Sequence, residues 1–151
     1  MKKLIFVIMM SFLLVACNGD SVQHVKLVEL EIGEKVEIVF LSGEKSEGKA
    51  REKETQEILS LGVSGKKKVI AVKTVYKNGF LFSAEVIYVS AEKDSGLKIK
   101  FLTSNTKYFP EREKEIKNLV EGIMSGSLNI VAVQSVYQNS HLVAAEIYYQ
   151  E

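Results

Sequence analysis

The chain has 151 residues, a hydrophobic content of 46% and a formal net charge of +1 at neutral pH. Its single cysteine excludes an intramolecular disulfide and a multi-cysteine metal site. The near balance of charges argues against a basic surface for nucleic acid. The length suits one domain, which must be stabilised by its own hydrophobic core.

The first sixteen residues have the layout of a signal peptide. Lys2 and Lys3 place positive charge beside the N-terminus, and residues 4–15 are apolar except for Ser11. As a helix this run would rise about 18 Å, too little to cross a hydrocarbon core of about 30 Å. We therefore expect residues 1–16 to be a cleaved signal peptide.

A candidate lipid attachment site ends the apolar run. Leu14-Val15-Ala16-Cys17 resembles the lipobox of bacterial lipoproteins, in which an aliphatic residue and two small-to-medium residues precede an obligatory cysteine. The resemblance implies that the thiol of Cys17 receives a diacylglycerol, that the chain is cut before it, and that the new amine is often acylated. Two or three acyl chains anchor a protein stably, whereas one holds it only marginally. A secretory signal peptide with a coincidental cysteine is the alternative.

Acylation of Cys17 would make membrane lipid the first partner of this chain. We expect the mature protein on the outer face of the cell membrane. If the source has two membranes, the outer membrane remains open, because Asn18 is not the aspartate associated with inner-membrane retention. No nucleic acid is expected as a partner.

The mature chain is expected to begin with a short tether, residues 17–24, followed by one domain over residues 25–151. Within that domain, residues 25–32 predict a short strand, and residues 36–41 predict a second one after a turn.

An internal repeat organises the rest of the chain. Residues 37–90 and 98–151 align without a gap at a constant offset of sixty-one, and eighteen of the fifty-four positions are identical. Chance does not produce such an alignment, so duplication of one unit is the simplest explanation. The Arg-Glu-Lys-Glu runs at 51–54 and 112–115 are interpreted as exposed helix faces.

Each copy is predicted to run strand, helix, strand, strand. In the second copy, residues 97–102 alternate apolar and basic side chains, as in a half-buried strand. Pro110 suits the first turn of a helix. The apolar stripe of that helix is formed by Ile116, Leu119, Val120 and Ile123. The first copy has the same outline with a weaker stripe.

The last two strands of each copy form a predicted hairpin. In the first copy the turn is Asn78-Gly79, which favours the positive φ angles of a type I′ turn. The second copy has Asn139-Ser140 there. Glu85 and Glu146 are expected on the strand face opposite the apolar one, solvated or at an edge.

We expect an α+β fold in which the two copies pack as one pseudo-twofold domain. Units of about fifty-five residues bury too little surface to be stable alone, and the link at residues 92–96 is too short for a flexible linker. The predicted sheet is largely antiparallel, with six or seven strands and both helices on one face.

Few residues in the sequence indicate catalysis or metal binding. His24 and His141 lie far apart, and the chain has no glycine-rich phosphate loop, metal-ligand spacing or nucleophile elbow. We therefore predict no catalytic residue, no cofactor and no metal site. Glu85 and Glu146 are the one pair of carboxylates worth weighing for catalysis. The run at 66–68 is three lysines, either a solvated strand entry or a contact for anionic lipid.

Each copy closes on Ala-Glu-(Val/Ile)-(Ile/Tyr)-Tyr, at residues 84–88 and 145–149. With the strand and Glu-Lys helix before it, this unit resembles a family of small sporulation-associated bacterial proteins. The resemblance covers about fifty-five residues per copy and implies a fold but no activity. The lipobox and the duplication depart from that family's usual form.

These observations predict a non-catalytic binding or interaction module at the membrane surface, with an unidentified protein partner. Two alternatives remain open. One is a small cell-envelope hydrolase using Glu85 or Glu146, and the other is an exclusion or immunity lipoprotein of a mobile element.

Overall fold

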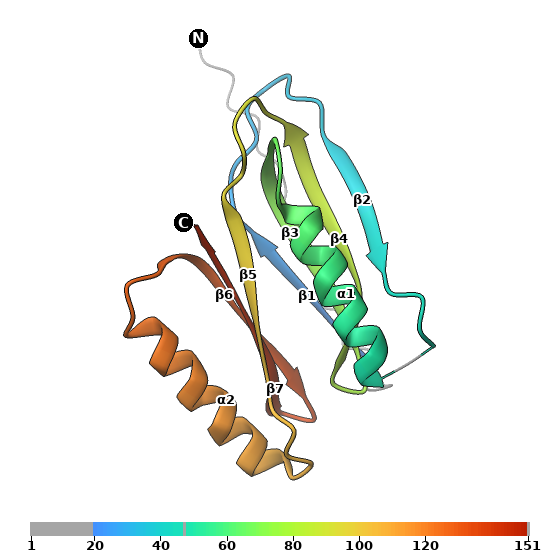
Figure 1. Cartoon of the computed structure of the whole chain (residues 1–151), viewed down its shortest axis with the longest axis vertical. Coiled ribbons are helices and arrows are strands. Elements are labelled where there is room, and N and C mark those ends of the chain that lie inside the picture. Colours follow the sequence, from blue (N-terminus) through green and yellow to red (C-terminus); the bar gives the residue numbers. More distant parts are fainter. Residues whose placement is uncertain (1–19, 47, 151) are drawn as a thin grey trace.

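The computed structural model describes residues 20–46 and 48–150 (Figure 1). Over these residues the fold is α+β, with two helices and two antiparallel sheets. In chain order the elements are β1 (Asp20–Lys26), β2 (Glu37–Ser42), α1 (Gly48–Val63), β3 (Lys67–Lys77), β4 (Phe80–Ser90), β5 (Leu97–Thr103), α2 (Phe109–Met124), β6 (Asn129–Gln138) and β7 (His141–Gln150). Neither helix is long and apolar enough to cross a membrane.

The prediction of a single sheet with both helices on one face is wrong. The described strands form a four-stranded sheet in the order β1-β3-β4-β2 and a three-stranded sheet in the order β5-β7-β6. The physical reason lies in β7, where every residue from Leu142 to Tyr148 is buried. A strand that is largely apolar on both sides is most stable between two layers, so the central strand of the three-stranded sheet is covered on both faces.

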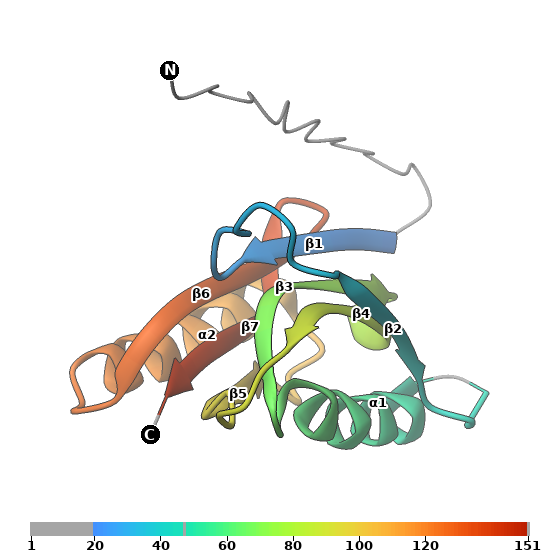
Figure 2. The ribbon, with the colours of Figure 1, turned by 90° about the horizontal axis from the view of Figure 1, so that it is seen from above.

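In Figure 1, α2 lies to the left of the three-stranded sheet, and the four-stranded sheet with α1 lies to its right; Figure 2 shows the same elements from above. On the α2 side, a small core is formed by Leu102, Ile116, Leu142, Ala145 and Ile147. The main core lies between α1, the four-stranded sheet and the three-stranded sheet; among its buried residues are Leu59, Val63, Val72, Tyr76, Leu81, Val86, Val136, Val143 and Tyr148. The three-stranded sheet therefore packs beside α1 on the same face of the four-stranded sheet.

The first strand lies earlier in the chain than predicted. β1 covers Asp20–Lys26 and pairs antiparallel with β3, from Asp20 opposite Lys77 to Lys26 opposite Ala71. The expected tether therefore extends no further than Gly19. Residues 27–36, assigned in part to a strand, form a loop in which Ile32 is 95% exposed. The prediction was wrong because polar residues alternate with valine in β1, which gives this segment the composition of a flexible tether.

Both predicted hairpin turns are confirmed. Asn78 and Gly79 have φ angles of 52° and 78°, and Asn139 and Ser140 have φ angles of 49° and 65°. Positive φ at both central residues is the type I′ geometry that matches the twist of the strands. Ser140 adopts it without the freedom that Gly79 has.

The strand pairings recur at the offset seen in the sequence. Phe40 lies opposite Glu85, and Phe101 lies opposite Glu146. The register shifts of β3 against β4 fall between Val69 and Ala71 and between Val75 and Tyr76, and the shifts of β6 against β7 fall sixty-one residues later. Positions that are sixty-one residues apart in the sequence therefore lie on equivalent faces of the two sheets.

Candidate functional site

A buried carboxylate lies where the two sheets meet. Glu146 on β7 is 0% exposed, which corrects the expectation that it is solvated or at an edge. The hydroxyl of Tyr76 donates to its Oε1 at 2.6 Å, and the hydroxyl of Tyr148 donates to its Oε2 at 2.5 Å. Tyr76 comes from the four-stranded sheet, so the carboxylate joins the two layers.

Two further side chains complete this carboxylate cluster. Thr74 hydrogen-bonds Glu146 and accepts a hydrogen bond from Nε2 of Gln134 at 3.1 Å. The Oε1 atom of Gln134 is buried and has no hydrogen-bond partner among the described residues. The carboxylate cluster is thus Thr74, Tyr76, Gln134, Glu146 and Tyr148, contributed by β3, β6 and β7.

Burial dominates the titration of the cluster. It raises the pKa of Glu146, against the lowering effect of the hydroxyl groups that donate to the carboxylate. Burial, reinforced by the nearby carboxylate, also raises the pKa of Tyr76 and of Tyr148. Both tyrosines therefore remain neutral donors. A general acid or base must reach its substrate, and Glu146 is sealed from solvent, so the arrangement suits a structural contact between sheets.

Glu85, at the matched position of the first half, has a different environment. Its Oε1 lies 3.2 Å from Nζ of Lys73, and its side chain is 28% exposed. It lies on the face of the four-stranded sheet that is turned away from α1, whereas Glu146 lies inside the molecule. The fold does not bring the two glutamates together.

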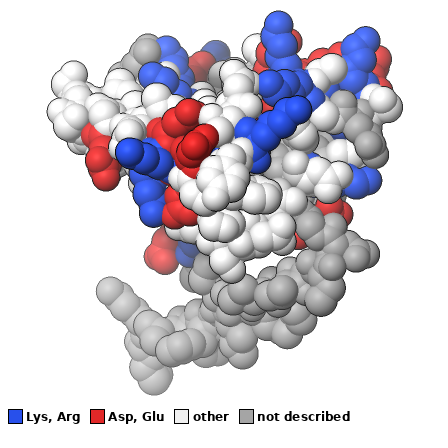
Figure 3. Space-filling view, turned by 90° about the horizontal axis from the view of Figure 1, so that it is seen from below, with Lys and Arg blue, Asp and Glu red and all other residues white. Residues whose placement is uncertain are grey.

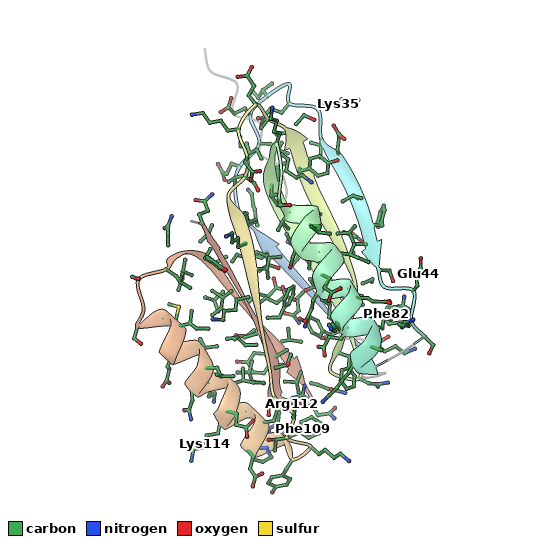
Figure 4. All side chains as sticks on the ribbon, in the orientation of Figure 1. Lys35, Glu44, Phe82, Phe109, Arg112 and Lys114 are labelled. Carbon is green, nitrogen blue, oxygen red and sulfur yellow. The ribbon has the colours of Figure 1, made fainter. Side chains whose placement is uncertain are left out.

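A charge interaction between the two halves lies at the beginnings of the helices, between Glu52 and Arg112. Glu52 is only 8% exposed, and the N–H of Leu81 donates to its Oε1 at 3.5 Å. Burial raises the pKa of Glu52, while Leu81 and the positive charge of Arg112 lower it. Arg112, labelled in Figure 4 at the beginning of α2, donates through Nε to the carbonyl of Val143 at 3.0 Å.

This interaction was not predicted from the sequence, because an Arg-Glu-Lys-Glu run is typical of an exposed helix face. That interpretation is wrong for Glu52, which is buried. Because only every third or fourth residue of a helix faces the core, one member of a charged run can be buried while its neighbour is solvated. Lys53, whose side chain is 80% exposed, is that neighbour.

A shallow pocket of about 250 Å³ lies at the hairpin end of the four-stranded sheet, lined in part by Arg51, Lys77 and Phe82. The Arg51 guanidinium stacks 3.8 Å from the centre of the Phe82 ring, and its Nε donates to the Phe82 carbonyl at 3.1 Å. Phe82 lies beside the first turns of α1 in Figure 4. Most small-molecule sites are larger than this pocket, and Arg51 already has partners in the fold.

The large exposed apolar side chains include two groups on different surfaces. The first is the outer face, the side of the four-stranded sheet that carries Val22, Ile38 and Phe40; Phe40 is 73% exposed. The second is the α2–β6 flank, where Met124, Val133 and Tyr137 are 53%, 39% and 51% exposed. Val22 lies on one edge strand of the outer face and Phe40 on the other, with the Lys73–Glu85 ion pair on the strands between them. Large apolar side chains that are exposed on one face of a folded domain are a feature of interaction sites.

The remaining candidate residues lie apart from one another. Nδ1 of His141 is 3.2 Å from Oε2 of Glu113, and its ring stacks on Phe109. His24 is exposed on β1. Among residues 20–46 and 48–150, no three His, Cys, Asp or Glu side chains are grouped as metal ligands. Cys17 lies outside the described residues.

On the face shown in Figure 3, basic and acidic side chains are interspersed, with no large area of one sign. Comparison of the chain with protein families, with curated proteins and with solved structures finds no match.

Proposed function

We propose that this chain is a lipoprotein of the cell envelope, anchored through acylated Cys17, that acts as a non-catalytic interaction module. The observation that carries the proposal is the pair of faces on which large apolar side chains are exposed. Phe40 on the outer face and Tyr137 on the α2–β6 flank are large side chains that are more than half exposed. Water-exposed aromatic groups of this size are characteristic of protein contacts.

We also propose that the two halves descend from one duplicated unit. The repeated pairings and register shifts support this origin. So does a repeated side-chain contact: Nε of Arg51 donates to the carbonyl of Phe82, and Nε of Arg112 donates to that of Val143. A twofold interface would bury matched positions equally. Because Glu146 is buried and Glu85 is not, the halves pack head to tail.

The position of β1 favours an anchor close to the hairpin end of the four-stranded sheet. Asp20 follows Cys17 by three residues, which span about 10 Å at most, and it pairs with Lys77 beside the Asn78-Gly79 turn. Lys67 lies at the opposite end of β3, an eleven-residue strand that is roughly 35 Å long. The lysine run at 66–68 is therefore a poor candidate for lipid contact.

The anchor is tested by Cys17→Ser in the full chain. The expected result is loss from the membrane fraction or accumulation of the unprocessed precursor, while the matched variant Ser21→Ala stays in the membrane at mature size. Tight membrane binding of Cys17→Ser at mature size would show that the anchor is wrong.

The hydrolase alternative has little support in the geometry. Glu146 is enclosed and accepts two tyrosine hydroxyls, and Glu85 is paired with Lys73 on an open face. No observation on the described residues favours the exclusion or immunity alternative.

The interaction role is tested by recovering a tagged full chain from detergent-solubilised membranes. We expect a protein partner to be recovered by the natural chain and by Lys53→Asp, and to be lost when Phe40→Asp and Tyr137→Asp are combined in one chain. Repeated recovery of the tagged chain with no partner, including no untagged copy of itself, would contradict the role.

A further inference from the structure

The contact between the halves has a donor surface and a receiver surface. The donor surface is the side of the three-stranded sheet that carries Val136, Ala144 and Glu146, and it faces the four-stranded sheet. The receiver surface lies beside α1 on β3, where Thr74 and Tyr76 hydrogen-bond Glu146. Each surface has a counterpart in the other half, formed by the residues at the equivalent positions, sixty-one apart in the sequence.

The matched receiver surface is unoccupied in a single chain. Val72, which is 0% exposed in the receiver, corresponds to Val133, which is 39% exposed. Tyr76 is 2% exposed, and its counterpart Tyr137 is 51% exposed. In the same core cluster Val63 on α1 is 0% exposed, whereas its counterpart Met124 on α2 is 53% exposed. The α2–β6 flank is therefore a receiver surface without its donor.

The matched donor surface is the outer face. Its residues repeat the chemistry of the buried donor: Phe40 for Phe101, Ala71 for Ala132, Val75 for Val136 and Glu85 for Glu146. The hydroxyls that hold Glu146 are repeated on the open receiver as well, since Tyr137 replaces Tyr76 and Ser135 replaces Thr74. Both partners of the internal contact are thus present a second time on the surface.

We propose that a second copy of this chain docks head to tail, with the outer face of one molecule on the α2–β6 flank of the next. Glu85 of the first copy accepts hydrogen bonds from Tyr137 and Ser135 of the second, as Glu146 does from Tyr76 and Thr74 within the chain. Phe40 packs beside α2. The inference rests on the proposed interaction role and names its partner.

Two features make this contact weaker than the internal one. Lys73 stands where the buried donor surface has Gln134, so docking must desolvate the ion pair of Lys73 with Glu85. Val28 also packs against Ile70 and Val89 and covers one end of the outer face. The contact is therefore reversible and favoured by the high local concentration that a shared membrane provides.

Because donor and receiver are different surfaces, the contact does not close on itself after two copies. Heterologous contacts of this kind extend into rings or filaments, whereas twofold contacts end at a dimer. The distribution of oligomer sizes therefore reports the geometry of the contact.

The first test cross-links the full chain in its membrane. Glu85→Cys and Tyr137→Cys are combined in one chain and treated with a short bismaleimide, because the replaced side chains meet end to end. We expect a ladder of dimers, trimers and larger species. The matched control combines Lys53→Cys and Glu92→Cys, which are exposed outside both surfaces. A ladder no stronger than the control, or products that stop at dimers, would overturn the proposal.

The second test mixes two blocked variants, Phe40→Asp and Tyr137→Asp, as detergent-solubilised full chains. Each has one intact surface, so each alone should be monomeric in sedimentation, while the mixture should form dimers and nothing larger. Circular dichroism confirms that both remain folded. A mixture that associates no more than its components contradicts head-to-tail docking.

The outcomes separate this inference from the interaction role. If the pull-down recovers another protein while cross-linking gives no ladder, self-association is wrong and the interaction role stands. If both experiments fail, both proposals are wrong.

Discussion

The two halves place the same side chains in opposite environments. Tyr76 is 2% exposed and donates to a buried carboxylate, while Tyr137 is 51% exposed. The glutamates are reversed, since Glu146 in the second half is sealed and Glu85 in the first is paired with a lysine on the surface. The two halves share their local sequence and strand geometry. The difference in exposure therefore arises from the element that packs over each face.

Substitutions on the buried donor surface show how the sequence accommodates that burial. Lys73 is replaced by Gln134 and Ser83 by Ala144, so that an ammonium and a hydroxyl are absent where water is excluded. Ile87 is replaced by Tyr148, whose hydroxyl supplies one of the donors to Glu146. An isolated buried carboxylate would be strongly unfavourable, and each donor reduces that penalty.

The largest expected effect comes from truncating the matched tyrosines. Tyr76→Ala should lower the free energy of unfolding by about 3–5 kcal/mol, because it leaves a cavity in the core and removes a donor to Glu146. Tyr137→Ala should lower it by less than about 1 kcal/mol. Urea unfolding followed by circular dichroism measures both. Equal losses would show that the receiver surfaces are equally buried in solution.

The matched glutamates come next. Glu146→Ala should cost roughly 2–3 kcal/mol, because the hydroxyls of Tyr76 and Tyr148 lose their acceptor in a site without water. Glu85→Ala should change stability by less than about 1 kcal/mol, as expected for a partly exposed ion pair. The same urea titrations compare the two. A neutral Glu146→Ala would contradict the bridging role of this carboxylate.

The pH dependence of stability should also report the burial of Glu146. The raised pKa of Glu146 means that the folded state holds its proton more tightly than the unfolded state. Its contribution is therefore full below the usual value of about 4.5 and declines as the pH rises through the raised pKa, by about 1.4 kcal/mol per unit of difference.

Glu146→Gln should remove that decline, so the variant gains stability relative to the natural chain between pH 5 and pH 8. Ser60→Ala, at an exposed position of α1, is the control and should leave the difference between these pH values unchanged. Glu52, whose pKa is also raised, keeps its contribution in both variants. Parallel urea titrations at the two pH values provide the measurement, and a Glu146→Gln profile that follows the natural one would refute the assignment.

The smallest effect concerns the turns. Ser140→Gly should raise stability by about 1 kcal/mol, because it removes the strain of a side chain at a φ of 65°. Gly79→Ser should lower it by a similar or larger amount, since a Cβ there would lie 3.1 Å from Oε1 of Gln138. Thermal unfolding should show shifts of a few degrees in opposite directions. Shifts in the same direction would rule out turn strain as the cause.

The sequence by itself determined the elements with strong local signals. The hairpin turns follow from Asn78-Gly79 and Asn139-Ser140, and the strand predicted at 97–102 is observed as Leu97–Thr103. The α2 helix begins next to Pro110, as the proline indicates. Each of these depends on backbone torsions or on side-chain periodicity within a few residues, which a neighbouring element does not change.

Only the tertiary structure decided which faces are buried. The two-sheet arrangement, the position of β1 and the enclosure of Glu146 all depend on contacts between residues far apart in the chain, such as Tyr76 with Glu146. Glu85 and Glu146 occupy the same place in the same local pattern, so no local rule separates them. The difference comes from the layer that packs over one face and leaves the other open, because burial is a property of the whole fold.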